Sequence, residues 1–185
     1  MVLAFLRAEI DSPRFGPYHL SALQQLGFDR RLIEMADLAD DGQNAARRRV
    51  LGAVRGYGAD QFLFRGFPDD ARWRRILLVP SDYRRLKYAN EETWIILSEG
   101  TRLVVVGADN VTKGRAAPVT AHNILEIAKA LRAGAVFPEL IAIETQGCLI
   151  LIEGHSRATA SCLESTENVQ MIVGSSLKMN RWVWI

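Results

Sequence analysis

An apolar strand that runs into a glycine-led polar turn is the feature that most constrains this chain. Residues 148–160 read CLILIEGHSRATA, five apolar residues followed by Glu153, Gly154 and a polar, alanine-containing stretch. We expect a buried strand that ends near Glu153 and a helix that begins after Gly154. A helix start presents free backbone N–H groups and a positive dipole end, and glycine lets a ligand approach the backbone closely. Because Arg157 adds a cation one turn into the helix, the pattern predicts an anion site, with phosphate the best-fitting anion.

The composition indicates a globular protein and excludes several classes. The 185 residues are 49% hydrophobic and 24% charged, and the formal net charge is +2. The chain is therefore not mainly disordered, and so small a charge indicates neither a nucleic-acid coat nor a membrane surface. No apolar segment approaches the roughly 20 residues of a membrane helix, and the start of the chain has no basic leader. Cys148 and Cys162 are too few for a zinc site or a disulfide framework. We expect a reduced, cytoplasmic protein without a metal site.

The N-terminal part of the chain reads as short helices separated by breaks. Residues 20–26 carry leucines at helical spacing, and a longer helix is expected over residues 44–55, with Asn44 as its cap. The longer helix contains three consecutive arginines at 47–49, which point in three directions and cannot form one groove-reading face. This run is either a solvated surface or a contact for a phosphate or an acidic partner.

The rest of the chain alternates strands and helices. Strands are expected at 76–79, 140–143, 149–152 and 169–173, helices at 81–88, 91–97, 120–134 and 155–163, and either a strand or a buried helix at 103–106. This order predicts an α+β fold. A linker-like stretch at 113–118 divides a mostly helical region, residues 1–112, from a sheet domain, residues 113–185. We expect the helical region to pack on the same core.

One segment of the chain runs from the helix ILEIAKAL at residues 124–131 to the motif Glu153-Gly154-His155-Ser156-Arg157. This segment resembles the ParB/sulfiredoxin-like superfamily. Its members carry a helix, a Gly/Pro boundary and a hairpin that ends in Gly-x-x-Arg. The turn reads Gly-Glu-Arg-Arg in chromosome-partitioning ParB proteins and Asp-Gly-His-His-Arg in the related free-serine kinases. The resemblance covers about residues 120–174. It implies a mixed sheet with helices and a phosphorylated ligand, a nucleotide with Mg²⁺ being the cofactor that the serine kinases suggest.

The motif also departs from its relatives. His155 stands where sulfiredoxin has its reactive cysteine, and Cys162 lies further along the helix, where we expect it to be packed rather than nucleophilic. Sulfinic-acid reduction is therefore not expected. His155 and Ser156 replace the Glu-Arg pair of partitioning ParB proteins, and no DNA-reading domain is expected after Gly174.

Six residues form the candidate site. Glu153 and His155 are the candidates for catalysis, and Gly154, Ser156, Arg157 and Thr159 are the candidates for ligand binding. An arginine fork donates two hydrogen bonds to one oxyanion, although Arg157 is equally placed for a structural salt bridge with Glu153. The two hydroxyls either cap the helix or donate to the ligand. Because histidine titrates near neutrality, His155 serves as an acid–base group or as a cation that binds a phosphate, or else it only covers the pocket.

The resemblance implies a protein that binds a nucleotide or another phosphorylated small molecule at residues 154–157. If the protein is an enzyme, phosphoryl transfer or nucleotide hydrolysis is the implied reaction. One alternative is a ParB-like metal-dependent nuclease, with Asp109, Glu139, Glu144 and Glu153 as available acids of no diagnostic spacing. The other is a non-catalytic protein-interaction module, for example in a bacterial multi-protein system. The apolar end at residues 182–185 either folds onto the core or forms a dimer contact.

Overall fold

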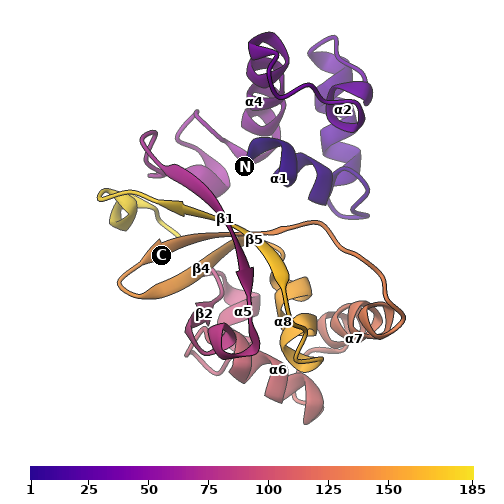
Figure 1. Ribbon diagram of the computed structural model, residues 1–185, viewed down its shortest axis with the longest axis vertical. Helices are drawn as coiled ribbons and strands as arrows, with labels where there is room; N and C mark the ends of the chain where they lie inside the picture. Colours follow the sequence, from indigo (N-terminus) through magenta and orange to yellow (C-terminus); the bar gives the residue numbers. More distant parts are fainter. The chain divides into compact units, whose positions relative to one another are not determined.

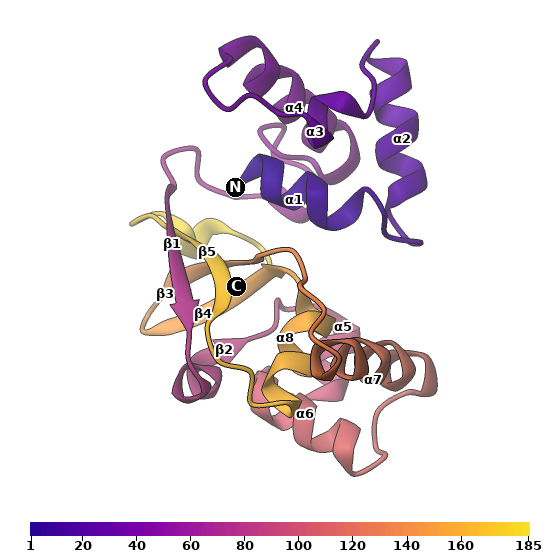
Figure 2. The same ribbon diagram turned by 45° about the vertical axis from the view of Figure 1, so that its right-hand side comes forward.

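Five strands form one mixed sheet in the order β1-β5-β3-β4-β2 (Figures 1 and 2). The computed structural model describes residues 1–185. The strands are β1 (Arg72–Leu78), β2 (Leu86–Lys87), β3 (Leu140–Thr145), β4 (Cys148–Glu153) and β5 (Val169–Ser175). β5 lies antiparallel to β1 and parallel to β3, β3 and β4 form an antiparallel hairpin, and β2 runs parallel to β4. The predicted α+β class is confirmed.

The β3–β4 hairpin turns over two residues that both have left-handed backbones. Gln146 has φ +48° and Gly147 has φ +76°, and Thr145 pairs with Cys148 across the turn. Two consecutive positive φ angles match the right-handed twist of the flanking strands. This turn joins the strands expected at 140–143 and 149–152, and it sets which hairpin residues face the core.

Alternate strand residues face a core that is lined by helices. Leu140 and Ala142 of β3, Leu149 and Leu151 of β4 and Met171 and Val173 of β5 belong to one buried cluster. The helices of this unit are α5 (Glu92–Leu97), α6 (Val104–Thr112), α7 (Pro118–Arg132) and α8 (His155–Leu163), with the 3₁₀ turn η2 (Pro80–Arg85). A further 3₁₀ turn, η3 (Met179–Arg181), lies near the end of the chain. Ile124 of α7 and Ala158 of α8 are fully buried in the same cluster. The apolar residues that alternate along the strands thus pack against the apolar faces of α7 and α8.

Residues 103–106, which fitted either a strand or a buried helix, begin α6. Val104, Gly107, Ala108 and Val111 are buried at the i, i+3, i+4 and i+7 positions of one helical face. The β-branched run favours a strand only when it is read alone, because the helical period appears over the longer window. Gly107 is needed there for packing, since an added Cβ would lie 2.2 Å from the Tyr88 hydroxyl oxygen.

The chain divides into two compact units at Asp69 and Asp70, whereas the sequence suggested a division near residue 112. The first unit holds Met1–Asp69 with Arg181–Val183, and the second holds Asp70–Asn180 with Trp184–Ile185. β1 belongs to the second unit because all seven of its residues pair with β5. Sequence composition did not reveal this pairing, which joins segments about 100 residues apart.

The first unit contains α1 (Val2–Glu9), α2 (Gly16–Gln25), α3 (Arg31–Glu34), α4 (Asp41–Arg55) and the 3₁₀ turn η1 (Phe62–Phe64). α4 begins earlier than expected: Asp40, not Asn44, is the cap, and its carboxylate accepts a hydrogen bond of 3.0 Å from the Gln43 amide. Trp182 is buried in this unit and donates from Nε1 to the Leu63 carbonyl oxygen at 2.7 Å. The expectation that the apolar chain end folds back is confirmed for Trp182.

The three consecutive arginines of α4 have unlike environments. Arg47 is 1% exposed, and its guanidinium donates to the carbonyl oxygens of Leu32 and Asp37 and to the side chains of Gln43 and Asn44. Arg48 and Arg49 are exposed. Neither of the two interpretations offered for the run therefore applies to Arg47. Its hydrogen bonds hold together the loop and helix around it.

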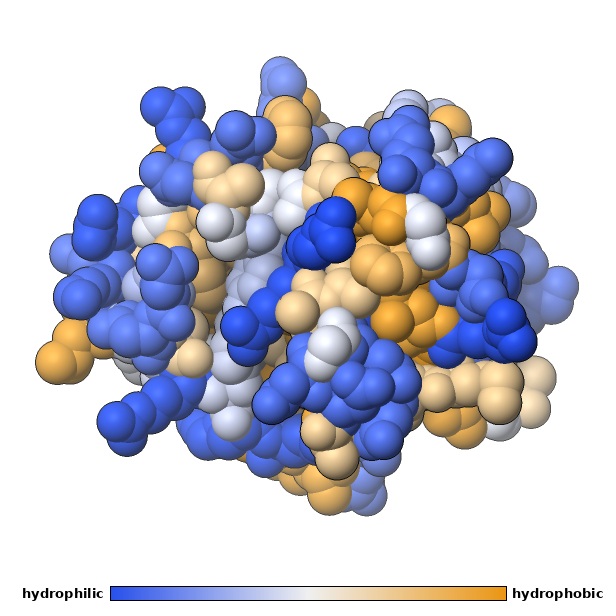
Figure 3. Space-filling view, turned by 90° about the horizontal axis from the view of Figure 1, so that it is seen from above, coloured by the Kyte–Doolittle hydropathy of each residue, from blue (hydrophilic) through white to orange (hydrophobic).

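The surface in Figure 3 is mostly hydrophilic, with apolar groups lying between polar ones. No helix of the chain has the length and apolar character needed to cross a membrane.

Candidate functional site

The predicted junction exists: β4 ends at Glu153 and α8 begins at His155, with Gly154 between them. Gly154 has φ +92°, a left-handed conformation that favours glycine. An added Cβ would lie 2.5 Å from Leu140 Cδ2 and 3.2 Å from Arg157 Nη2. No side chain caps the start of α8. We call the segment Glu153–Arg157 the β4–α8 corner.

The Arg157 side chain lies over Gly154 and is engaged within the chain. Its Nη2 donates to the Glu153 carboxylate, and its Nη1 donates to the Pro138 carbonyl oxygen and, at 3.4 Å, to that of Glu139. The side chains of Arg157 and Glu153 are only 12% and 17% exposed. The guanidinium therefore lies at the start of α8, and Glu153 supplies the negative charge beside it.

His155 is the outer member of an aromatic cluster with Tyr88 and Trp94. Its ring stacks on Trp94 with centroids 5.0 Å apart, and Trp94 stacks on Tyr88 at 4.9 Å. His155 Nε2 accepts a long hydrogen bond of 3.4 Å from the Ala89 amide. Since an acceptor nitrogen carries no proton, this contact favours the tautomer with hydrogen on Nδ1. The ring thus covers the corner on one side, while an acid–base role for His155 stays a prediction.

Thr159 is fully buried and fixes the first turn of α8. Its hydroxyl donates to the His155 carbonyl oxygen at 2.9 Å and therefore accepts from the Tyr88 hydroxyl, 2.7 Å away. Burial raises the pKa of Tyr88 well above its usual range, so the phenol keeps its proton for this bond. Of the two roles considered for Thr159, the structure shows the structural one. Its side chain has no exposed surface, so direct contact with a ligand would require this part of the chain to move.

Ser156 is the ligand-binding candidate with an available hydroxyl. It is half-buried on the first turn of α8, and no hydrogen bond within the chain holds its side chain. The backbone around it is that of an uncapped helix start. The corner therefore offers one free hydroxyl, while its guanidinium is engaged by the Glu153 carboxylate and by two carbonyl oxygens.

The sequence did not identify Tyr88, Trp94 and Pro138 as parts of this site. They lie 19 to 71 residues from the motif residues that they contact, as Pro138 does from Arg157 and Tyr88 from Thr159. No local signal pointed to Tyr88, because residues 81–88 were expected to form a helix, whereas the structure has the 3₁₀ turn η2 and strand β2 before this residue. Only the fold brings the three residues to α8.

The acids available for a metal-dependent nuclease are not brought together. Asp109 pairs with Lys113, Glu139 with Arg75, and Glu144 with Arg74 and Arg85. No group of three or more His, Cys, Asp or Glu side chains is arranged to hold a metal ion. Each of these carboxylates therefore has a basic partner of its own.

Cys162 is half-buried on α8, and burial raises the pKa of its thiol to about 11. A thiol with so high a pKa is almost wholly protonated at neutral pH and is a poor nucleophile. This agrees with the expectation that Cys162 is a packed residue. Neither Cys162 nor Cys148 forms a disulfide.

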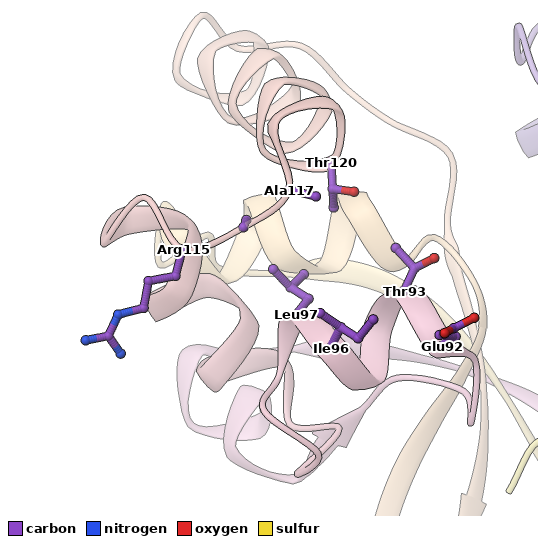
Figure 4. Close-up of a pocket in the computed structure, with 8 residues that line it drawn as sticks. Glu92, Thr93, Ile96, Leu97, Arg115, Ala117 and Thr120 are labelled. Atoms are coloured by element: carbon purple, nitrogen blue, oxygen red, sulfur yellow. The ribbon is translucent and has the colours of Figure 1, made fainter.

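A separate cavity of about 250 Å³ lies between α5 and the start of α7 (Figure 4). Ile96 and Leu97 of α5 point toward Ala117 and Thr120, while the Arg115 side chain extends away from the cavity. Its lining is mostly apolar and includes none of the six candidate site residues. We regard it as a packing gap between two helices rather than as the site of chemistry.

Comparisons with models of protein families, with curated proteins and with solved structures found no match for this chain. The resemblance to the ParB/sulfiredoxin-like superfamily accordingly remains a prediction.

Proposed function

We propose that this chain binds a phosphorylated ligand at the β4–α8 corner, with the phosphate taking the place of the Glu153 carboxylate beside Arg157. The observation that carries the proposal is the guanidinium held over Gly154 at an uncapped helix start. Backbone N–H groups, a helix dipole and an arginine fork together suit an anion with several oxygens. The free Ser156 hydroxyl adds a further donor.

We also propose that the sheet unit is ParB/sulfiredoxin-like and that a nucleotide is the natural form of the ligand. The order helix, hairpin, glycine-led corner, helix and strand, seen in α7, β3, β4, α8 and β5, supports this assignment. The unpaired cysteines support a cytoplasmic location. Mg²⁺ bound to the nucleotide would offset repulsion between its phosphates and Glu153.

Binding without turnover is the form of the proposal that the geometry supports best. His155 is stacked on Trp94 and hydrogen-bonded to the Ala89 amide, so it is not placed to move a proton. The second candidate function is a non-catalytic protein-interaction module. The observation that favours it is the mutual pairing of Glu153 and Arg157, which leaves the corner electrostatically satisfied without a ligand.

Thermal unfolding in the presence of ligands tests the proposal. We expect ADP, ATP, CTP or pyrophosphate, with or without Mg²⁺, to raise the melting temperature of the wild type. A ligand at 100 times its Kd adds about 2.7 kcal/mol of stability, or roughly 5–10 °C for a chain of this size. Arg157→Ala should abolish the shift, whereas Glu153→Gln should enlarge it because the guanidinium loses its competing partner.

The matched control is Arg132→Ala, which removes an arginine that pairs with Glu164 at the surface of the same unit. This variant should keep the wild-type shift. A shift that survives in Arg157→Ala places the ligand elsewhere, and no shift in either the wild type or Glu153→Gln favours the interaction module.

A further inference from the structure

β1 is the outermost strand of the sheet, and its outer edge has no strand beside it (Figure 2). It pairs with β5 through seven consecutive residues without a bulge, and no proline interrupts it. At the opposite end of the sheet, β2 has only two residues. β1 is therefore the one long, regular edge whose outward N–H and C=O groups can pair with another strand.

The side chains of this edge are unusual for a solvent-exposed strand. Leu77 is 56% exposed and Val79, just after the strand, is 43% exposed. By strand alternation they lie on the same face as Trp73 and Arg75. Trp73 covers Gly174 of the neighbouring strand, where an added Cβ would lie 2.7 Å from the indole ring. The edge thus combines apolar contact surface with unpaired backbone groups.

The same segment concentrates positive charge. Residues 72–85 contain five arginines and one acid, in a chain whose net charge is only +2. Arg72 is exposed and forms no ion pair, while Arg74 and Arg75 pair with Glu144 and Glu139 at the surface. Exposed pairs of this kind contribute little and exchange partners at low cost. An incoming acidic chain can therefore recruit these arginines.

We propose that β1 accepts an extended acidic segment of a partner protein as a sixth strand of the sheet. Backbone pairing supplies affinity, Leu77 and Trp73 contact alternate apolar side chains of the partner, and the arginines select for acidic ones. A second copy of this chain suits the edge less well than an acidic segment, because its β1 carries the same exposed arginines, and antiparallel pairing centred on Arg75 puts this arginine opposite its own copy. Like charges directly opposite each other destabilise a sheet.

The probe is a fluorescein-labelled decapeptide of alternating glutamate and valine, titrated with the full chain and followed by fluorescence anisotropy. We expect saturable binding that weakens with added salt. Arg72→Glu combined with Arg74→Gln changes two exposed arginines on the face opposite Leu77, where the glutamates of the peptide would lie, and should lower the affinity about tenfold or more. The matched control, Arg48→Glu combined with Arg49→Gln, makes the same charge change on α4 and should leave the affinity unchanged.

Amide hydrogen exchange of the wild type identifies the binding mode without a variant. The β1 amides should gain protection when the peptide binds, and a peptide with glycine in place of valine should bind more weakly. The proposal is overturned by absence of binding, by equal loss in the control variant, or by protection outside β1. It is also overturned if the free chain dimerises through β1, or if duplex DNA binds this edge more tightly than the peptide.

Discussion

Replacing Arg47 with alanine is expected to lower the free energy of unfolding by about 2–4 kcal/mol. The guanidinium is almost completely buried and donates to two backbone carbonyl oxygens and two side-chain oxygens. Truncation leaves the Leu32 and Asp37 carbonyls without these partners in a space that the arginine filled. Urea denaturation followed by circular dichroism measures the loss.

Arg48→Ala is the control for this substitution, because the neighbouring side chain is exposed on the same helix. Its effect should stay within about 0.5 kcal/mol, as for most surface substitutions. Equal effects of the two variants would show that Arg47 is not the organising residue of this part of the chain. An Arg47→Lys variant should recover only part of the loss, since an ammonium group cannot reproduce the planar fork.

Gly154→Ala is expected to destabilise the protein by about 2–4 kcal/mol. Alanine is strained at φ +92°, and its Cβ would collide with the buried Leu140 side chain 2.5 Å away. The collision also displaces Arg157 from its position over the corner. Unfolding by urea gives the stability, and the same sample should show weakened ligand binding.

The Gly134→Ala variant separates the two causes of the expected loss, which are backbone strain and collision with neighbouring side chains. Gly134 has φ +84° but nothing lies within 4 Å of an added Cβ, so only the backbone strain remains. We expect a loss of about 1 kcal/mol there. If the two alanine variants lose equal stability, the close packing of Leu140 and Arg157 against Gly154 is not important.

Local sequence patterns predicted β3, β4, β5, α5, α7 and α8, but the helix expected over residues 81–88 is the 3₁₀ turn η2 followed by strand β2, and β1 begins four residues before the strand expected at 76–79. The strand, the glycine-led turn and the helix start could be recognised from the 13 residues 148–160. The corner therefore could be placed on the fold before its surroundings were known.

Contacts between distant segments could not be predicted in the same way. The pairing of β1 with β5 moved the unit boundary, and the contact of Tyr88 with Thr159 added an aromatic cluster to the corner. A charged run gives no sign of which member is buried, and so the distinct role of Arg47 was not anticipated. The Glu153–Arg157 pair was considered from the sequence, but only coordinates show that Pro138 and Glu139 also bind the guanidinium.

The most direct test of the corner is a titration of the ¹⁵N-labelled chain with pyrophosphate and with ADP, followed by two-dimensional NMR. The account predicts saturable shifts that are largest for the amides of Gly154, Ser156 and Arg157, and that disappear in Arg157→Ala. Shifts confined to other segments, or unchanged spectra at millimolar ligand, would contradict it.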